Sequence, residues 1–88
     1  MQVEGIWRPV PPEQRAFGRA VRELRARRWM SQEGLGFAAG LHRNYVGALE
    51  RGETNPTFRT VLRVVRGLGV PLGELVAVYE RQLGDGRG

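Results

Sequence analysis

The stretch from Ser31 to Gly52, SQEGLGFAAGLHRNYVGALERG, constrains the fold more than any other part of this 88-residue chain. Counted from Gln32, the fifth and ninth positions hold Gly36 and Gly40. The first glycine lets two helices cross closely, and the second can adopt the positive φ that ends a helix. Apolar residues are spaced so that they face one shared core: Leu35, Ala39, Leu41, Val46 and Leu49. The stretch therefore predicts two short helices joined by a tight turn.

The residues that flank this unit agree with a helix-turn-helix. Serine and glutamine open the first helix, ERG closes the second, and Asn55 and Pro56 follow shortly after. Taken together, LRARRWMSQEGLGFAAGLHRNYVGALERGETNP resembles the Cro/repressor-like (XRE) family of bacterial and phage transcription regulators, and the resemblance extends from about Phe17 to about Leu75. It implies an all-α fold with five helices. The chain also resembles restriction-modification controller proteins, which are short regulators of this kind.

On this interpretation the chain has three parts: an N-terminal arm over residues 1–12, a helix-turn-helix DNA-binding domain over 13–83 and a flexible C-terminal tail over 84–88. The arm contains three of the five prolines and has no helical period, so we expect it to be extended. Ile6, Trp7 and Val10 would pack it onto the body or onto a partner subunit; otherwise it is a loosely ordered tail. A single Arg8 gives little support to an arm that enters a minor groove.

Caps and apolar spacing predict the limits of the helices. The first helix starts at Pro12 or Glu13, and the others are expected over residues 32–39, 43–51, 57–67 and from 72 onward. Trp29 stands where the family usually has the glycine that ends the first helix. Because tryptophan adopts the left-handed conformation poorly, we expect this helix to end differently, with Trp29 and Met30 covering the edge of the core.

Charge and composition limit the partners and exclude several functions. The formal net charge is +5 and every one of the 14 basic residues is arginine, which suits a polyanion such as nucleic acid and would also suit a membrane surface. The absence of cysteine excludes disulfides and thiolate metal sites. With one histidine and no paired carboxylates, we expect no enzyme activity, no cofactor and no metal. No apolar run is long enough to span a bilayer, so we expect a soluble cytoplasmic protein without membrane contact.

The helix predicted over residues 43–51 is the candidate for DNA recognition, and eight residues are predicted to contact DNA. The resemblance implies that Gln32 bonds a phosphate or braces a recognition residue, and that Asn55 contacts a phosphate. His42 is either the N-cap of the recognition helix or a phosphate contact. Gly47 and Ala48 are expected to make the outer face of this helix shallow, which would let the backbone approach base edges. The eight are Gln32, His42, Arg43, Asn44, Gly47, Ala48, Arg51 and Asn55.

The function predicted from these residues is a sequence-specific transcriptional regulator, such as a repressor, that binds double-stranded operator DNA through the major groove. The alternative on the same fold is the antitoxin of a toxin–antitoxin pair. The resemblance also places Arg25 opposite Glu50 as an ion pair. A homodimer is expected because the last helix carries more apolar residues than one small core needs: Leu75, Val76, Val78, Tyr79 and Leu83.

Overall fold

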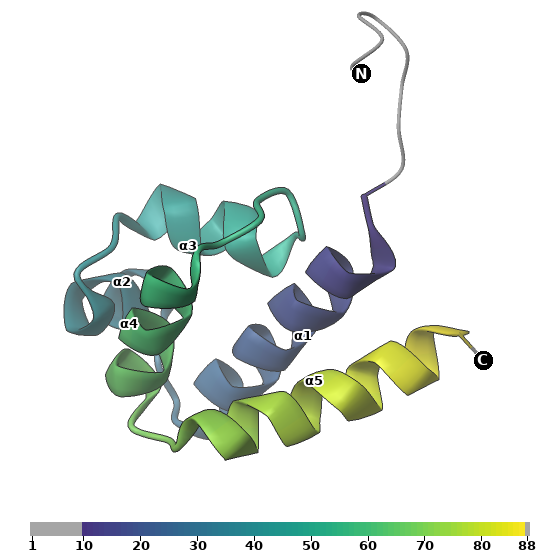
Figure 1. The fold of residues 1–88 in the computed structure, drawn as a ribbon. Helices are drawn as coiled ribbons and strands as arrows, with labels where there is room; N and C mark the ends of the chain where they lie inside the picture. The colour runs from purple at the N-terminus through teal and green to yellow at the C-terminus, as the bar shows by residue number, and fades with distance from the viewer. Residues whose placement is uncertain (1–9, 88) are drawn as a thin grey trace, which may run out of the picture.

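The structure is a computed structural model that describes residues 10–87, and this part of the chain forms five α-helices and no strand (Figure 1). The helices are α1 (Pro12–Arg27), α2 (Gln32–Ala39), α3 (Arg43–Glu50), α4 (Phe58–Leu68) and α5 (Leu72–Arg87). The predicted all-α fold with five helices is confirmed. The predictions for Ile6, Trp7 and Arg8 of the arm lie outside the described residues.

Capping residues set the helix limits much as the sequence predicted. The hydroxyl of Ser31 accepts a hydrogen bond of 2.9 Å from the backbone amide of Gly34 at the start of α2. Thr57 caps α4 in the same way, and its hydroxyl accepts from the Thr60 amide at 3.2 Å. At the other end of α2, Gly40 has a φ of 73° and forms the tight turn. Each cap satisfies backbone groups that the helix itself leaves unpaired.

The core lies where α1 and α5, side by side and antiparallel, meet the group formed by α2, α3 and α4 (Figure 1). At one end of this helix pair the Arg28 guanidinium donates to the Gly69 carbonyl at 3.0 Å. Further along the pair, Arg19 Nε in the middle of α1 donates to Gln82 Oε1 of α5 at 3.1 Å. The fully buried side chains of the core are Leu24, Leu35, Leu49, Leu68, Leu75, Val21, Val46 and Val64.

Two residues predicted to be surplus on the last helix belong to this core. Leu75 and Val78 are buried, so they stabilise the monomer and are not available to a partner. Among the five apolar residues predicted to be surplus, Val76 is exposed while Tyr79 and Leu83 are half-buried. The surplus is therefore smaller than the sequence indicated.

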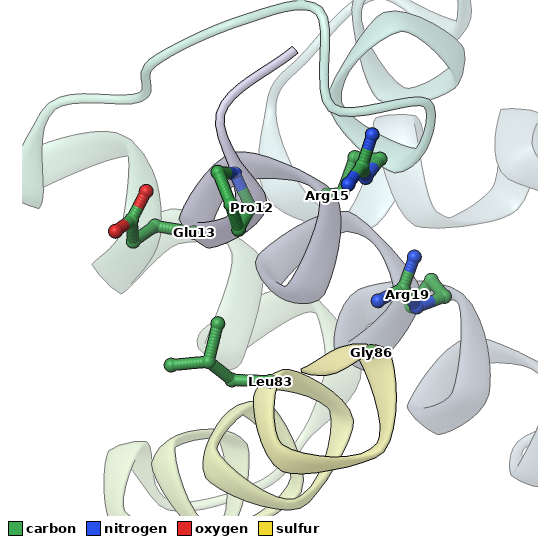
Figure 2. Close-up of a pocket in the computed structure, with 6 residues that line it drawn as sticks. All are labelled: Pro12, Glu13, Arg15, Arg19, Leu83 and Gly86. Atoms are coloured by element: carbon green, nitrogen blue, oxygen red, sulfur yellow. The ribbon is translucent and has the colours of Figure 1, made fainter. Parts of the chain in front are cut away.

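The end of α5 also differs from the prediction, because residues 84–87 were assigned to a flexible tail and are helical in the structure. Arg19 of α1 contacts the extra turn. Its side chain bonds Gln82 and lies across Gly86, where an added Cβ would be only 2.8 Å from Arg19 Nη2. Figure 2 shows the small cleft of about 130 Å³ that remains between the start of α1 and the end of α5, beside Pro12 and Leu83. None of the predicted DNA contacts lines this cleft.

The predicted end of the first helix is wrong for Trp29, whereas Met30 packs against the core as expected. Trp29 adopts the left-handed conformation with a φ of 57°, and its side chain is 95% exposed rather than packed on the core. The Trp29 amide donates to the Ala26 carbonyl and the Met30 amide donates to the Arg25 carbonyl, both at 3.1 Å. This is the hydrogen-bond pattern of a Schellman motif, which satisfies the last carbonyls of α1. Helix α1 therefore ends in a common C-terminal motif, with a tryptophan in the strained left-handed conformation that glycine usually adopts.

Candidate nucleic-acid interface

Helix α3 is placed by close backbone approaches at two glycines. A Cβ added to Gly18 of α1 would lie 2.4 Å from the Leu49 carbonyl oxygen of α3. A Cβ added to Gly36 of α2 would lie 2.5 Å from the carbonyl oxygen of Leu41, in the turn that leads into α3. Both distances are shorter than any real contact of that kind, so only glycine fits. The close crossing predicted from Gly36 is confirmed.

A buried polar network fixes the end of α3 against α1 and the start of α2. Arg25 Nε donates to Glu50 Oε2 at 2.6 Å, and Arg25 Nη2 donates to Glu50 Oε1 at 2.9 Å, which confirms the predicted ion pair. Arg25 Nη1 also donates to the Met30 carbonyl at 2.8 Å. The hydrogen bonds that Arg25 donates to Glu50 raise the pKa of Arg25, and burial lowers it by less. The guanidinium therefore stays charged, and its hydrogen bonds to Glu50 and Met30 join three segments of the chain.

Gln32 extends this network to the surface of the molecule. Its Nε2 donates to Glu50 Oε1 at 3.0 Å. The side chain then lies over Gly47 of α3, where an added Cβ would be 3.5 Å from Gln32 Oε1. Gln32 is thus held by a buried carboxylate while it remains exposed at the N-terminus of α2. The hydrogen bond to Glu50 therefore fixes the orientation in which the Gln32 amide faces the solvent.

An open groove of about 380 Å³ brings together five of the eight predicted DNA contacts. Arg43 and Asn44 come from the first turn of α3, and Arg51 follows its last residue. The residues that line the groove are Gln32, Arg43, Asn44, Gly47 and Arg51. Two guanidinium groups and two amides therefore converge on one open surface.

The two arginines of the groove each have a carboxylate partner that the sequence prediction did not include. Arg43 Nη1 lies 3.7 Å from Glu33 Oε1 of α2, which makes an ion pair without a hydrogen bond. Arg51 donates from Nε to Glu53 Oε2 at 3.0 Å and from Nη2 to Glu53 Oε1 at 3.1 Å. These hydrogen bonds raise the pKa of Arg51 and lower the pKa of Glu53. The charge of Glu53 two residues after Arg51 was a usable signal, whereas Glu33 reaches Arg43 only through the crossing of α2 and α3.

His42 is the N-cap of α3, as one of its two predicted roles required. Its Nδ1 accepts a hydrogen bond of 3.0 Å from the Asn44 amide. An acceptor at Nδ1 must be unprotonated, so the ring proton sits on Nε2. That N–H is free to donate to a group outside the helix. The phosphate contact that was the other predicted role of His42 stays a prediction.

Among the predicted contacts, Gly47 lines the groove without being exposed, and Ala48 and Asn55 lie outside the groove. Gly47 was expected on an exposed shallow face, but it is buried because the side chains of Gln32 and Arg51 cover it. Ala48 is half-buried and does not line the groove. Asn55 is exposed in the loop before α4, and the hollow that it lines is a separate one beside the start of α1. The shallow face that the sequence indicated is therefore wrong for Gly47.

Two further observations bear on the class of protein. None of the helices between residues 10 and 87 is long and apolar enough to cross a membrane. The same part of the chain holds no group of three or more His, Cys, Asp or Glu side chains that could bind a metal ion.

Known proteins are similar to this chain over most of its length. A family model described as helix-turn-helix matches residues 21–75. The chain is 38% identical over 61 residues to the control protein C.BamHI of Bacillus amyloliquefaciens, in an alignment that covers 68% of this chain and 75% of that protein. It is 32% identical over 69 residues to the cryptic phage CTXphi transcriptional repressor RstR of Vibrio cholerae, covering 78% of this chain and 62% of the repressor.

A solved structure is similar to this chain in both fold and sequence. The crystal structure of the restriction-modification controller protein C.AhdI from Aeromonas hydrophila is similar with a TM-score of 0.72 and 38% identity. The similarity covers 74% of this chain and 98% of C.AhdI. The sequence comparison and the structure comparison therefore both find control or controller proteins that are 38% identical to this chain where they align.

Proposed function

Because the chain belongs to the XRE-type helix-turn-helix family, we propose that it is a sequence-specific DNA-binding transcriptional regulator. The single observation that carries the proposal is the groove at α3, where Arg43, Asn44 and Arg51 lie beside the braced side chain of Gln32. A helix of this kind enters the major groove with its N-terminal residues toward the bases. The protein acts by binding in the cytoplasm and catalyses no reaction.

In this proposal the residues of the groove have two different roles. Arg43 and Asn44 read bases, because the first exposed side chains of a recognition helix reach furthest into the groove. Arginine can donate two hydrogen bonds to guanine, and asparagine can pair with adenine, each discriminating by about 1–3 kcal/mol. Gln32, Arg51 and Asn55 hold phosphates, which position the protein without carrying sequence information.

Binding titrations test this proposal after the preferred site has been selected from random DNA. Arg43→Ala should relax the preference at one base pair in each half-site. Arg51→Ala should weaken binding to every sequence and reduce the slope of log affinity against log salt by about one unit. Arg22→Ala, which removes an equal charge from an exposed position of α1, is the control. A chain that selects no DNA sequence at all would overturn the proposal.

We further propose that the chain binds its operator as a homodimer. Val76 of α5, which is 43% exposed, supports an interface on that helix. A two-fold pair would present two recognition helices about 34 Å apart, which matches half-sites one turn of DNA apart. The selected sites should then be palindromic.

The comparisons favour one narrower candidate, a controller of a restriction-modification system. C.BamHI is named as a control protein and C.AhdI as a restriction-modification controller, and both are 38% identical to this chain where they align. Such a role requires an operator close to the genes of a restriction enzyme and a methyltransferase. Footprinting of the chain on the DNA around its own gene, together with the sequence of the neighbouring genes, tests this candidate.

A further inference from the structure

Both arginines of the proposed interface are already paired with carboxylates in the free protein. The side chains remain open to solvent: Arg43 and Glu33 are 62% and 75% exposed, and Arg51 and Glu53 are 61% and 50% exposed. DNA can therefore reach either arginine from outside. To bind a base or a phosphate, however, each guanidinium must exchange its carboxylate for the new partner.

The pair at Arg51 has the geometry that a phosphate would require. Two oxygens of Glu53 face Nε and Nη2 of Arg51 side by side, and a phosphate group binds arginine with the same two parallel hydrogen bonds. The backbone holds Glu53 in this position, because its amide donates to the Ala48 carbonyl at 2.9 Å. Glu53 therefore occupies the place that a DNA phosphate would take on this arginine.

We propose that Glu33 and Glu53 compete with DNA for Arg43 and Arg51, and so hold the affinity below the value that the arginines alone would give. This inference rests on the proposed function. When DNA binds, each arginine loses one anion and gains another, and a carboxylate is left beside the phosphate backbone. Operator occupancy then begins at a higher protein concentration and stays reversible.

The two carboxylates should act on different kinds of contact. Glu33 faces the base-reading Arg43. Its removal should therefore raise the affinity for the selected operator at least as much as the affinity for a scrambled duplex, on which Arg43 finds fewer bases to contact. Glu53 faces the phosphate-binding Arg51, so its removal should favour every duplex equally. Neutralising Glu53 should leave the slope of log affinity against log salt nearly unchanged, because Arg51 contacts the same phosphate in both chains.

Titrations of the selected operator and a scrambled duplex test this with the full chain. Glu33→Gln and Glu53→Gln should each raise operator affinity by about 1.4- to five-fold, the range expected when an exposed ion pair no longer has to be broken. Glu80→Gln removes the same charge from an exposed position of α5 and should change the affinity much less. Thermal unfolding of each variant shows that it is folded.

A double-mutant cycle decides whether competition is the cause. In an Arg43→Ala background, Glu33→Gln should no longer raise the affinity, because the arginine that it releases is gone. If Glu33→Gln raises the affinity equally in both backgrounds, or not at all, the inference is overturned while the proposed function stands. If the unsubstituted chain binds neither duplex, both are overturned.

Discussion

Arg25 and Glu50 hold α1 and α3 together through an ion pair that water scarcely reaches, since their side chains are only 15% and 3% exposed. The two hydrogen bonds between them leave one oxygen of Glu50 shared with Gln32. The pair thus connects the core to a residue proposed to contact DNA. A change at either partner should be felt both in stability and at the interface.

Removing one partner of this pair should strand a buried charge. Arg25→Ala or Glu50→Ala should lower the free energy of unfolding by about 3–5 kcal/mol. For a domain of this size each kcal/mol corresponds to a fall of about 4–8 °C in Tm. Thermal unfolding measures the effect, with the exposed Arg22→Ala as control. Shifts no larger than that of Arg22→Ala would contradict the structural importance of the pair.

Adding a methyl group at Gly36 should force α2 away from the turn that precedes α3. Gly36→Ala should lower the free energy of unfolding by about 1–3 kcal/mol, although alanine is the better helix former. Gly84→Ala is the matched control, because a Cβ at this helical position meets nothing within 4 Å. It should raise stability by about 0.5–1 kcal/mol. Urea titrations should move the two midpoints in opposite directions, and a rise for both would sink the idea.

Trp29 should be a position where a smaller residue improves the fold. Its left-handed conformation costs an L-residue about 1–2 kcal/mol, and its exposed ring contributes little burial in return. Trp29→Gly should therefore raise the free energy of unfolding by about 1 kcal/mol. Trp29→Ala removes the ring but keeps the Cβ, so it should gain less. Equal stabilities for the two variants in calorimetry would show that the backbone strain is not the cause.

Glu23 should make the packing of α1 on α5 sensitive to acid. Burial raises the pKa of Glu23, but hydrogen bonds from Gln82 and Arg81 and the charges of Arg81 and Arg27 outweigh it and hold the pKa below its ordinary value of 4.5. The stabilisation is then fully present above pH 4.5 and is lost as pH falls through the lower pKa of the folded state. Glu23→Gln should be less stable than the parent at pH 7, and the difference should shrink in acid. A difference that is constant with pH, or that Glu80→Gln reproduces, would argue against this role.

The proposed homodimer predicts a specific effect of charge at Val76. Light scattering at about 100 µM protein, where even weak dimers form, should give twice the monomer mass. Val76→Glu should return the mass to that of a monomer, because it places a charge in the middle of the interface. Ala38→Glu, an equal change at an exposed position of α2, should leave the dimer intact. A monomeric parent protein would rule out this interface.

The sequence predicted most of the fold because caps and close glycine contacts are local and leave strong signals. Ser31, Gly40 and Thr57 each cap the helix next to them in the sequence, so their roles could be predicted without the tertiary structure. Trp29 was missed because the hydrogen bonds of the Schellman motif outweigh an unfavourable φ, and propensity alone does not weigh the two. The last turn of α5 was missed because it packs against Arg19, a residue more than sixty positions away, and sequence spacing does not show such a contact.

The candidate site was predictable in its residue types but not in its contacts. Arg43, Asn44 and Arg51 follow from the position of α3, and the structure brings them together with Gln32. The burial of Gly47 could not be predicted, because two flexible side chains from other positions fold over it. Long polar side chains choose partners from whatever the tertiary fold brings near. Sequence spacing therefore indicates which residues can contribute to such a surface, and the tertiary structure determines which of them pair with one another.

The contact between Gly18 and the Leu49 carbonyl has a consequence for the DNA itself. Two backbones that touch leave no room for the recognition helix to tilt or slide toward an imperfect site. Two such helices in a dimer would therefore keep a fixed separation and orientation. The DNA would have to change its bend or twist to fit them. Duplexes that bend or twist easily between the half-sites would fit at lower cost, even at base pairs that no side chain reaches.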